Sequence, residues 1–138
     1  MQEQNGAVRF KGNPLTLVGQ PATVGDPAPG FTVLDGEVNP VSLSDFDGSV
    51  VVVCAVPSFD PPVCYTEARR FNEEAAALGD DVAILVVSMD LPFAQSRWCG
   101  AAGVDRVRLI SVHKDASFGE AYGLLIKELR LLARAVIV

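Results

Sequence analysis

Hydrophobic and polar positions along the chain follow two kinds of pattern, one typical of strands and one of helices. Near the N-terminus, alternating apolar residues at 8, 10, 15 and 17 flank Gly12-Asn13-Pro14, which predicts a small β-hairpin at an edge of the domain. The continuous apolar runs 50–56 and 82–88 are typical of central strands that are buried on both faces. Shorter strands are expected at 31–34, 107–111 and 133–138.

Helical spacing occurs between these strands. Apolar or small residues at 68, 71, 75 and 78 predict a helix over 65–78, which Gly79 would end in a left-handed conformation. A second helix is predicted from Pro92 to Ala102, with Asp90 near its positive end, and a third over 117–122. Strands alternating with helices predict one α/β domain over residues 1–138, with three layers and a mainly parallel central sheet.

Composition and charge narrow the range of functions. Of the 138 residues, 49% are hydrophobic and 20% are charged, which fits a single core. The net charge is −6 and no block of like charges occurs, so neither nucleic acid nor a membrane is an expected partner. We find no apolar run of the kind that a signal peptide or a membrane span needs, and we expect a cytoplasmic location.

The cysteines Cys54, Cys64 and Cys99 are the candidate reactive groups. They form no CxxC pair, and the chain has one histidine, so neither a disulfide scaffold nor a metal site is expected. Cys54 lies among valines in a predicted strand and is interpreted as a core residue. Cys99, near the end of the second helix, is interpreted as structural unless it has a partner.

Cys64 differs because it stands where a proline-rich loop meets a helix. The unpaired N–H groups and the dipole at a helix start favour a thiolate, and Arg69 and Arg70 add positive charge. Such surroundings can lower a thiol pKa from about 8.5 to between roughly 3.5 and 7.5, although burial opposes the shift. Pro57 and Pro61 would hold the loop rigid, as oriented displacement chemistry requires. We expect a reactive thiol, and an inert core cysteine is the alternative.

Three other residues are interpreted as structural. His113 has no evident carboxylate or nucleophile near it in the sequence, so it is expected to be a surface residue and not a catalytic base. Phe93 and Trp98 are expected to fill the core or an interface, since aromatic side chains do so far more often than they bind an aromatic ligand.

Seven segments of the chain, taken together, carry a family resemblance. They are FKGNPLTL, GDPAPGF, PSFDPPVC, RRFN, SMDLPFAQSRWCG, ASFGEAYG and LLARAV, and the match extends over essentially the whole chain, from Val8 to Val138. These segments resemble the thiol peroxidases, the atypical two-cysteine subfamily of the peroxiredoxins, and DLPFAQSRWCG is the most specific of them. The resemblance implies a thioredoxin-like fold with an N-terminal hairpin, and an activity that reduces hydrogen peroxide and organic hydroperoxides.

The resemblance also implies roles for particular residues. By position, Cys64 matches the peroxidatic cysteine, Cys99 the resolving cysteine, and Arg134 the arginine that faces the reacting sulfur. The implied product is a Cys64 sulfenic acid, which condenses with Cys99 to a disulfide that thioredoxin reduces. Arg134 keeps its charge, so it can stabilise both the thiolate and the departing oxygen. A homodimer is expected, and no cofactor is implied.

Two features depart from the family pattern. Members usually carry a threonine three residues before the peroxidatic cysteine, whereas this chain has Pro61, and losing that hydroxyl could cost on the order of a hundredfold in rate. Pro57 is retained, and both prolines are expected to border the substrate. The chain stops at Val138, where the family continues with a strand and a C-terminal helix. We expect that these elements are missing; the alternative is that another subunit covers the sheet.

Three functions therefore remain open. A peroxidase recycled by thioredoxin is the favoured one. A catalytically impaired redox sensor or binding protein of the same fold is the alternative that Pro61 and the short C-terminus suggest. A general thiol–disulfide oxidoreductase is a weaker third reading, because the paired-cysteine motif of that class is absent.

Overall fold

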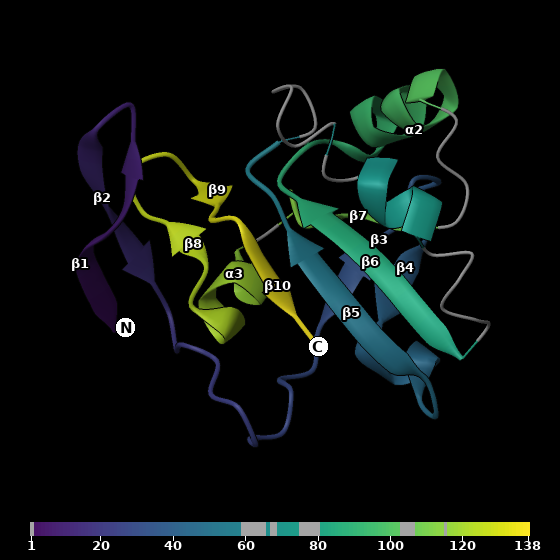
Figure 1. The fold of residues 1–138 in the computed structure, drawn as a ribbon, viewed down its shortest axis with the longest axis horizontal. Coiled ribbons are helices and arrows are strands. Elements are labelled where there is room, and N and C mark those ends of the chain that lie inside the picture. Colours follow the sequence, from purple (N-terminus) through teal and green to yellow (C-terminus); the bar gives the residue numbers. More distant parts are fainter. Residues whose placement is uncertain (1, 59–65, 67–68, 75–80, 103–106, 115) are drawn as a thin grey trace.

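The computed structural model describes residues 2–58, 66, 69–74, 81–102, 107–114 and 116–138 (Figure 1). Within the predicted helix 65–78, residues 66 and 69–74 are described and are helical. The other residues of that helix, and Gly79, lie outside the described residues. The remaining elements are β1 (Glu3–Phe10), β2 (Asn13–Val18), β3 (Thr32–Leu34), β4 (Pro40–Ser42), the 3-10 helix η1 (Leu43–Phe46), β5 (Val50–Ala55), β6 (Val82–Ser88), α2 (Pro92–Ala102), β7 (Arg108–Ser111), α3 (Ser117–Tyr122), β8 (Leu125–Ile126), β9 (Leu131–Leu132) and β10 (Ala135–Ile137).

A mixed sheet of six strands forms the centre, in the order β10-β5-β6-β7-β3-β4. Strands β5, β6 and β7 are parallel, whereas β10, β3 and β4 are added in antiparallel fashion. The predicted parallel arrangement is thus confirmed for the central strands and does not extend to the outer ones. β3 and β4 are antiparallel because the connection between them is short, and only antiparallel strands can be joined by a tight turn.

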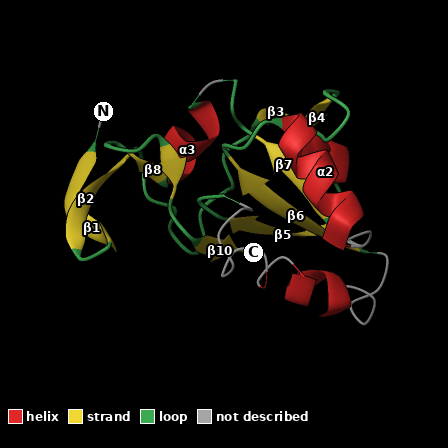
Figure 2. Cartoon of the chain, turned by 90° about the horizontal axis from the view of Figure 1, so that it is seen from above, coloured by secondary structure: helices red, strands yellow, loops and turns green. Residues whose placement is uncertain are grey.

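Side chains of the central strands alternate between two cores, one on each face of the sheet. α3 lies against one face, and α2 and the helical segment 69–74 lie on the other (Figure 2). The first core contains Phe31, Val33, Val41, Val53, Ala55, Leu85, Val87, Ile110, Val112, Phe118, Tyr122 and Leu132. The second contains Cys54, Val56, Ile84, Val86, Val107 and Leu109, with Phe71 and Trp98 packed against it. The predicted three layers are therefore present.

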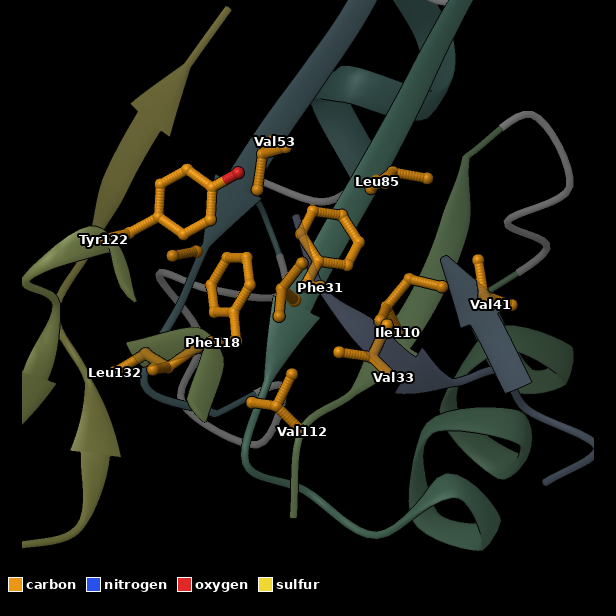
Figure 3. Packing of buried hydrophobic residues seen from close by; sticks show 12 residues of the cluster. Phe31, Val33, Val41, Val53, Leu85, Ile110, Val112, Phe118, Tyr122 and Leu132 are labelled. Carbon is orange, nitrogen blue, oxygen red and sulfur yellow. The ribbon is translucent and has the colours of Figure 1, made fainter. Parts of the chain in front are cut away.

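Three aromatic rings join α3 to the rest of the first core (Figure 3). The rings of Phe31 and Phe118 meet edge to face with centroids 5.4 Å apart, and those of Phe118 and Tyr122 are 4.8 Å apart. The Tyr122 hydroxyl donates a hydrogen bond of 2.7 Å to the Pro29 carbonyl, and burial raises the pKa of Tyr122. This contact holds the extended segment before β3 against α3.

The predicted hairpin forms at an edge of the domain, where β1 is the outer strand of a second sheet. β1 and β2 are antiparallel, with Val8 opposite Leu15, and β2 pairs with β8, which pairs with β9. These four strands make a separate small sheet beside the central one (Figure 1). The sequence did not indicate this second sheet, because β8 and β9 are two residues long each, too short to produce a periodic pattern.

Glu128 fastens the hairpin to the chain after β8. Its carboxylate accepts hydrogen bonds from the Thr16 amide (2.8 Å) and the Thr16 hydroxyl (2.9 Å), and Lys127 pairs with Glu3 at 2.7 Å. The bond from the Thr16 amide is the main reason that the pKa of Glu128 lies below its usual value.

We expect the stabilisation by Glu128 to disappear in acid. Its pKa is lower in the folded than in the unfolded chain, so its contribution is complete above the unfolded pKa and is lost as the pH falls through the folded pKa. Glu128→Gln keeps the shape but cannot ionise, and should flatten this part of the pH dependence. Urea unfolding midpoints between about pH 7 and about pH 3 measure the effect. Glu37→Gln, at an exposed site, is the control; equal acid dependence in Glu128→Gln and the unmodified protein contradicts the prediction.

Candidate active site

Both cysteine segments begin at the same end of the central sheet. β5 ends at Ala55 and leads toward Cys64, while the parallel β6 ends at Ser88 and leads into α2, which carries Cys99. The two strands are neighbours, with Ala55 opposite Val87. In α/β sheets, ligands usually bind beyond the carboxyl ends of the strands. The carboxyl ends of β5 and β6 are therefore the candidate active site.

The structure describes some of the predicted site residues and not others. Cys64 and Pro61 lie outside the described residues. The backbone of Cys99 lies in α2, in the second half of the helix, as predicted. Pro57 is half-buried and lies two residues after the end of β5, and Arg134 is exposed and directly precedes β10.

Arg134 and Pro57 are brought together by the pairing of β10 with β5. In this antiparallel pair Ala135 lies opposite Ala55, so the preceding Arg134 falls opposite Val56, the residue before Pro57. Arg134 thus lies beside the carboxyl end of β5, the strand that precedes Cys64 in the sequence. Sequence reasoning reached Arg134 through the family resemblance alone, because β5 and β10 are far apart in the chain.

A polar network centred on Asp90 occupies the same end of the sheet. The Ser58 hydroxyl donates to Asp90 Oδ1 (2.9 Å), and the Ser88 hydroxyl donates to Asp90 Oδ2 (2.8 Å). Gln95 Nε2 in α2 donates to Ser88 Oγ and to the Ile110 carbonyl, both at 2.9 Å. Ser88 and Gln95 are completely buried. The network therefore links the ends of β5, β6 and β7 to the first turn of α2.

The network continues to His113. The Ser111 hydroxyl donates to the Asp90 carbonyl, so its oxygen is left to accept a hydrogen bond from Nδ1 of His113 at 2.9 Å. His113 is half-buried, which corrects the expectation of a plain surface residue. The network was missed in the sequence, where the available signal was the polar residues Ser88 and Ser111 directly at the ends of buried strands.

The remaining sequence interpretations have mixed outcomes. Cys54 is a fully buried cysteine of β5 in the second core, so its structural reading is confirmed. Trp98 is half-buried against the same core, as expected. Phe93 does not fill the core, because it lies at the start of α2 with 72% of its surface exposed. A role for Phe93 in an interface stays a prediction.

Two negative findings hold for the described part of the chain. It contains no group of three or more His, Cys, Asp or Glu side chains that could hold a metal ion. Within the same ranges, the helices are too short or too polar to cross a membrane.

Comparison with known proteins then gives the family. A family model described as Redoxin matches residues 23–138. The chain belongs to the redoxin family. Over 131 residues it is 57% identical to a thiol peroxidase of Bacillus subtilis, an alignment that covers 95% of this chain and 78% of that protein. A thiol peroxidase of Halalkalibacterium halodurans is 55% identical over 132 residues, which cover 96% of this chain and 79% of that one.

Solved structures agree with this membership. A peroxiredoxin-like protein from Aquifex aeolicus superposes with a TM-score of 0.84 at 41% identity, over 91% of this chain and 74% of that chain. A thiol peroxidase from Chromobacterium violaceum, at 22% identity and a TM-score of 0.76, covers 89% of this chain and 73% of its own and shares the fold. The predicted thioredoxin-like fold and the predicted enzyme class, a thiol-dependent peroxidase of the peroxiredoxin type, are confirmed.

Proposed function

We propose that this peroxidase reduces hydrogen peroxide and organic hydroperoxides, with Cys64 as the nucleophile, Cys99 as the resolving thiol and thioredoxin as the reductant. The observation that carries the proposal is the parallel pairing of β5 with β6, through which both cysteine segments start at one end of the sheet. The family membership supplies the reaction class.

In the first step the Cys64 thiolate attacks the terminal oxygen of the hydroperoxide. A sulfur–oxygen bond forms and the oxygen–oxygen bond breaks, so the sulfur becomes a sulfenic acid and the departing oxygen takes a proton to leave as water or an alcohol. Negative charge moves from sulfur to the departing oxygen during this step. The position of Arg134 opposite Val56 supports its proposed role, because a permanent cation there can stabilise both charges. Pro57 and Pro61 are proposed to border the substrate.

In the second step the Cys99 thiolate attacks the sulfenic sulfur of Cys64. A disulfide forms, and the hydroxide that leaves takes a proton and becomes water. Thioredoxin then returns two electrons by thiol–disulfide exchange, which restores both thiols and leaves thioredoxin with a disulfide. We further propose that the enzyme works as a homodimer, as the family resemblance implies, and that it does so in the cytoplasm, the location predicted from the sequence.

The stoichiometry and the product of a single turnover test this scheme. The reduced chain should consume one equivalent of hydrogen peroxide and lose two hydrogen atoms, because one disulfide forms for each peroxide reduced. Intact mass measures the loss, and non-reducing peptide mapping should identify a peptide pair joined through Cys64 and Cys99. A disulfide that contains Cys54, or a sulfenic acid that persists without forming a disulfide, would contradict the scheme.

A further inference from the structure

We propose that Asp90 is a positioning residue of the peroxidase reaction, whose carboxylate ties the segment leading to Cys64 to the start of the helix that carries Cys99. The inference rests on the proposed function of the two cysteines and deepens it. It assigns a role to a side chain that neither the sequence patterns nor the family resemblance singled out as part of the site.

The two oxygens of Asp90 bind hydroxyls from two different strand ends. Oδ1 accepts from Ser58, which lies six residues before Cys64, and Oδ2 accepts from Ser88 at the end of β6. Asp90 itself stands two residues before Pro92, where α2 begins. Hydrogen bonds to an ionised carboxylate are stronger than those between neutral groups. One charged group therefore connects the beginnings of both cysteine segments.

The residues that hold Asp90 in place are buried and hydrogen-bonded. Its amide donates to Ser88 Oγ at 3.2 Å, and its carbonyl accepts from the hydroxyl of Ser111. Gln95, one helical turn before Cys99, donates to Ser88 and so joins α2 to the same network. Ser88, Ser111 and Gln95 each expose 1% of their surface or less. The hydroxyls of Ser88 and Ser111 and Nε2 of Gln95 are all hydrogen-bonded in this buried network, so Asp90 holds Ser58 at a fixed place relative to α2.

A fixed place for Ser58 matters because the peroxide reaction depends on alignment at sulfur. A displacement of about 1 Å at a reacting group can cost on the order of a hundredfold in rate. The chain between Ser58 and Cys64 is short, so a shift of Ser58 changes where the Cys64 segment starts. A carboxylate with a structural role alone would change the stability of the protein and leave the rate of each folded molecule unchanged.

Asp90→Asn tests the role, since the amide keeps the shape but removes the charge and replaces one of the two carboxylate oxygens with a donor. The rate constant for oxidation of Cys64 by hydrogen peroxide, measured in single turnovers, should fall about tenfold. The rate of disulfide reduction by thioredoxin should stay within about twofold, because that step does not need the same alignment. Urea unfolding of each variant corrects the rates for the folded fraction.

Variants of Ser58 show whether Asp90 acts through this hydroxyl. Ser58→Ala should be as slow as Asp90→Asn, and Ser58→Thr, which retains a hydroxyl, should recover most of the rate. The double variant should be no slower than either single one, since residues that act through one contact are not additive. Additive losses, or Ser58→Thr as slow as Ser58→Ala, would overturn the proposal.

Asp45→Asn is the matched control. Asp45 lies in η1, which precedes the amino end of β5. Its carboxylate accepts a hydrogen bond of 2.9 Å from the Ser42 amide. This variant should oxidise at the unmodified rate, and an equal loss in Asp45→Asn would overturn the assignment to Asp90. A readout without peroxide separates this inference from the proposed function. The rate constant for alkylation of Cys64 by iodoacetamide should change in Asp90→Asn and not in Asp45→Asn. Equal rate constants in the two variants would overturn the positioning role of Asp90, even if the peroxidase scheme fails.

Discussion

Replacing Cys64 with serine should reduce thioredoxin-dependent peroxide turnover by about a thousandfold or more, to the background of the assay. A serine hydroxyl is almost never ionised at neutral pH, and it cannot form a sulfenic acid or a disulfide. Removing the sulfur therefore removes both the nucleophile and the carrier of the two electrons. The measurement is steady-state consumption of hydrogen peroxide with reduced thioredoxin in excess.

Cys54→Ala provides the matched control for this experiment. Cys54 is fully buried in β5, in the core that contains Val56 and Val86, and we expect its replacement to leave turnover essentially unchanged. Full turnover in Cys64→Ser would show that another group is the nucleophile. Loss of turnover in Cys54→Ala, in a protein that is still folded by circular dichroism, would mean that the buried cysteine had been assigned wrongly.

Replacing Phe118 with alanine should lower the free energy of unfolding by about 3–5 kcal/mol. Phe118 exposes 1% of its surface and contacts both Phe31 and Tyr122 within the first core. Truncation removes a large apolar group and leaves a cavity between α3 and the central sheet, which the surrounding strands can fill only in part. The measurement is equilibrium unfolding in urea.

Phe93→Ala is the control for the size of the residue removed. Phe93 is 72% exposed in α2, so its loss should change the free energy of unfolding by no more than about 0.5 kcal/mol. Phe118→Leu retains part of the volume and keeps the effect measurable if Phe118→Ala does not fold. Similar unfolding midpoints for Phe118→Leu and Phe93→Ala would show that α3 is not held by this core.

Several elements could be predicted from the sequence with their exact bounds. β6 at Val82–Ser88, α2 at Pro92–Ala102 and α3 at Ser117–Tyr122 all lie where the patterns placed them. The signals of β6 and α2 are local: a continuous apolar run and a proline at a helix start. After α3, Gly123 adopts a left-handed conformation with φ of 68°, which ends the helix. Such signals involve neighbouring residues and need no knowledge of the rest of the chain.

The candidate site could be predicted in part. The three cysteines differ visibly in the sequence, and Cys54 could be recognised as a core residue from the valines around it. The pairing of Cys64 with Cys99 and the role of Arg134 came from the family resemblance and stay predictions. The polar network could not be derived, because Ser58 and Asp90 are separated by 32 positions and meet only when β5 and β6 pair.

By itself, then, the sequence determined which stretches form the long strands and helices, and it predicted which cysteine is reactive. The tertiary structure alone decided that the hairpin pairs with β8, that Arg134 lies beside the end of β5, and that Asp90 joins two strand ends. The physical reason is distance along the chain. Periodicity and capping act between residues a few positions apart, whereas strand pairing and buried hydrogen bonds depend on which distant segments the whole fold brings together.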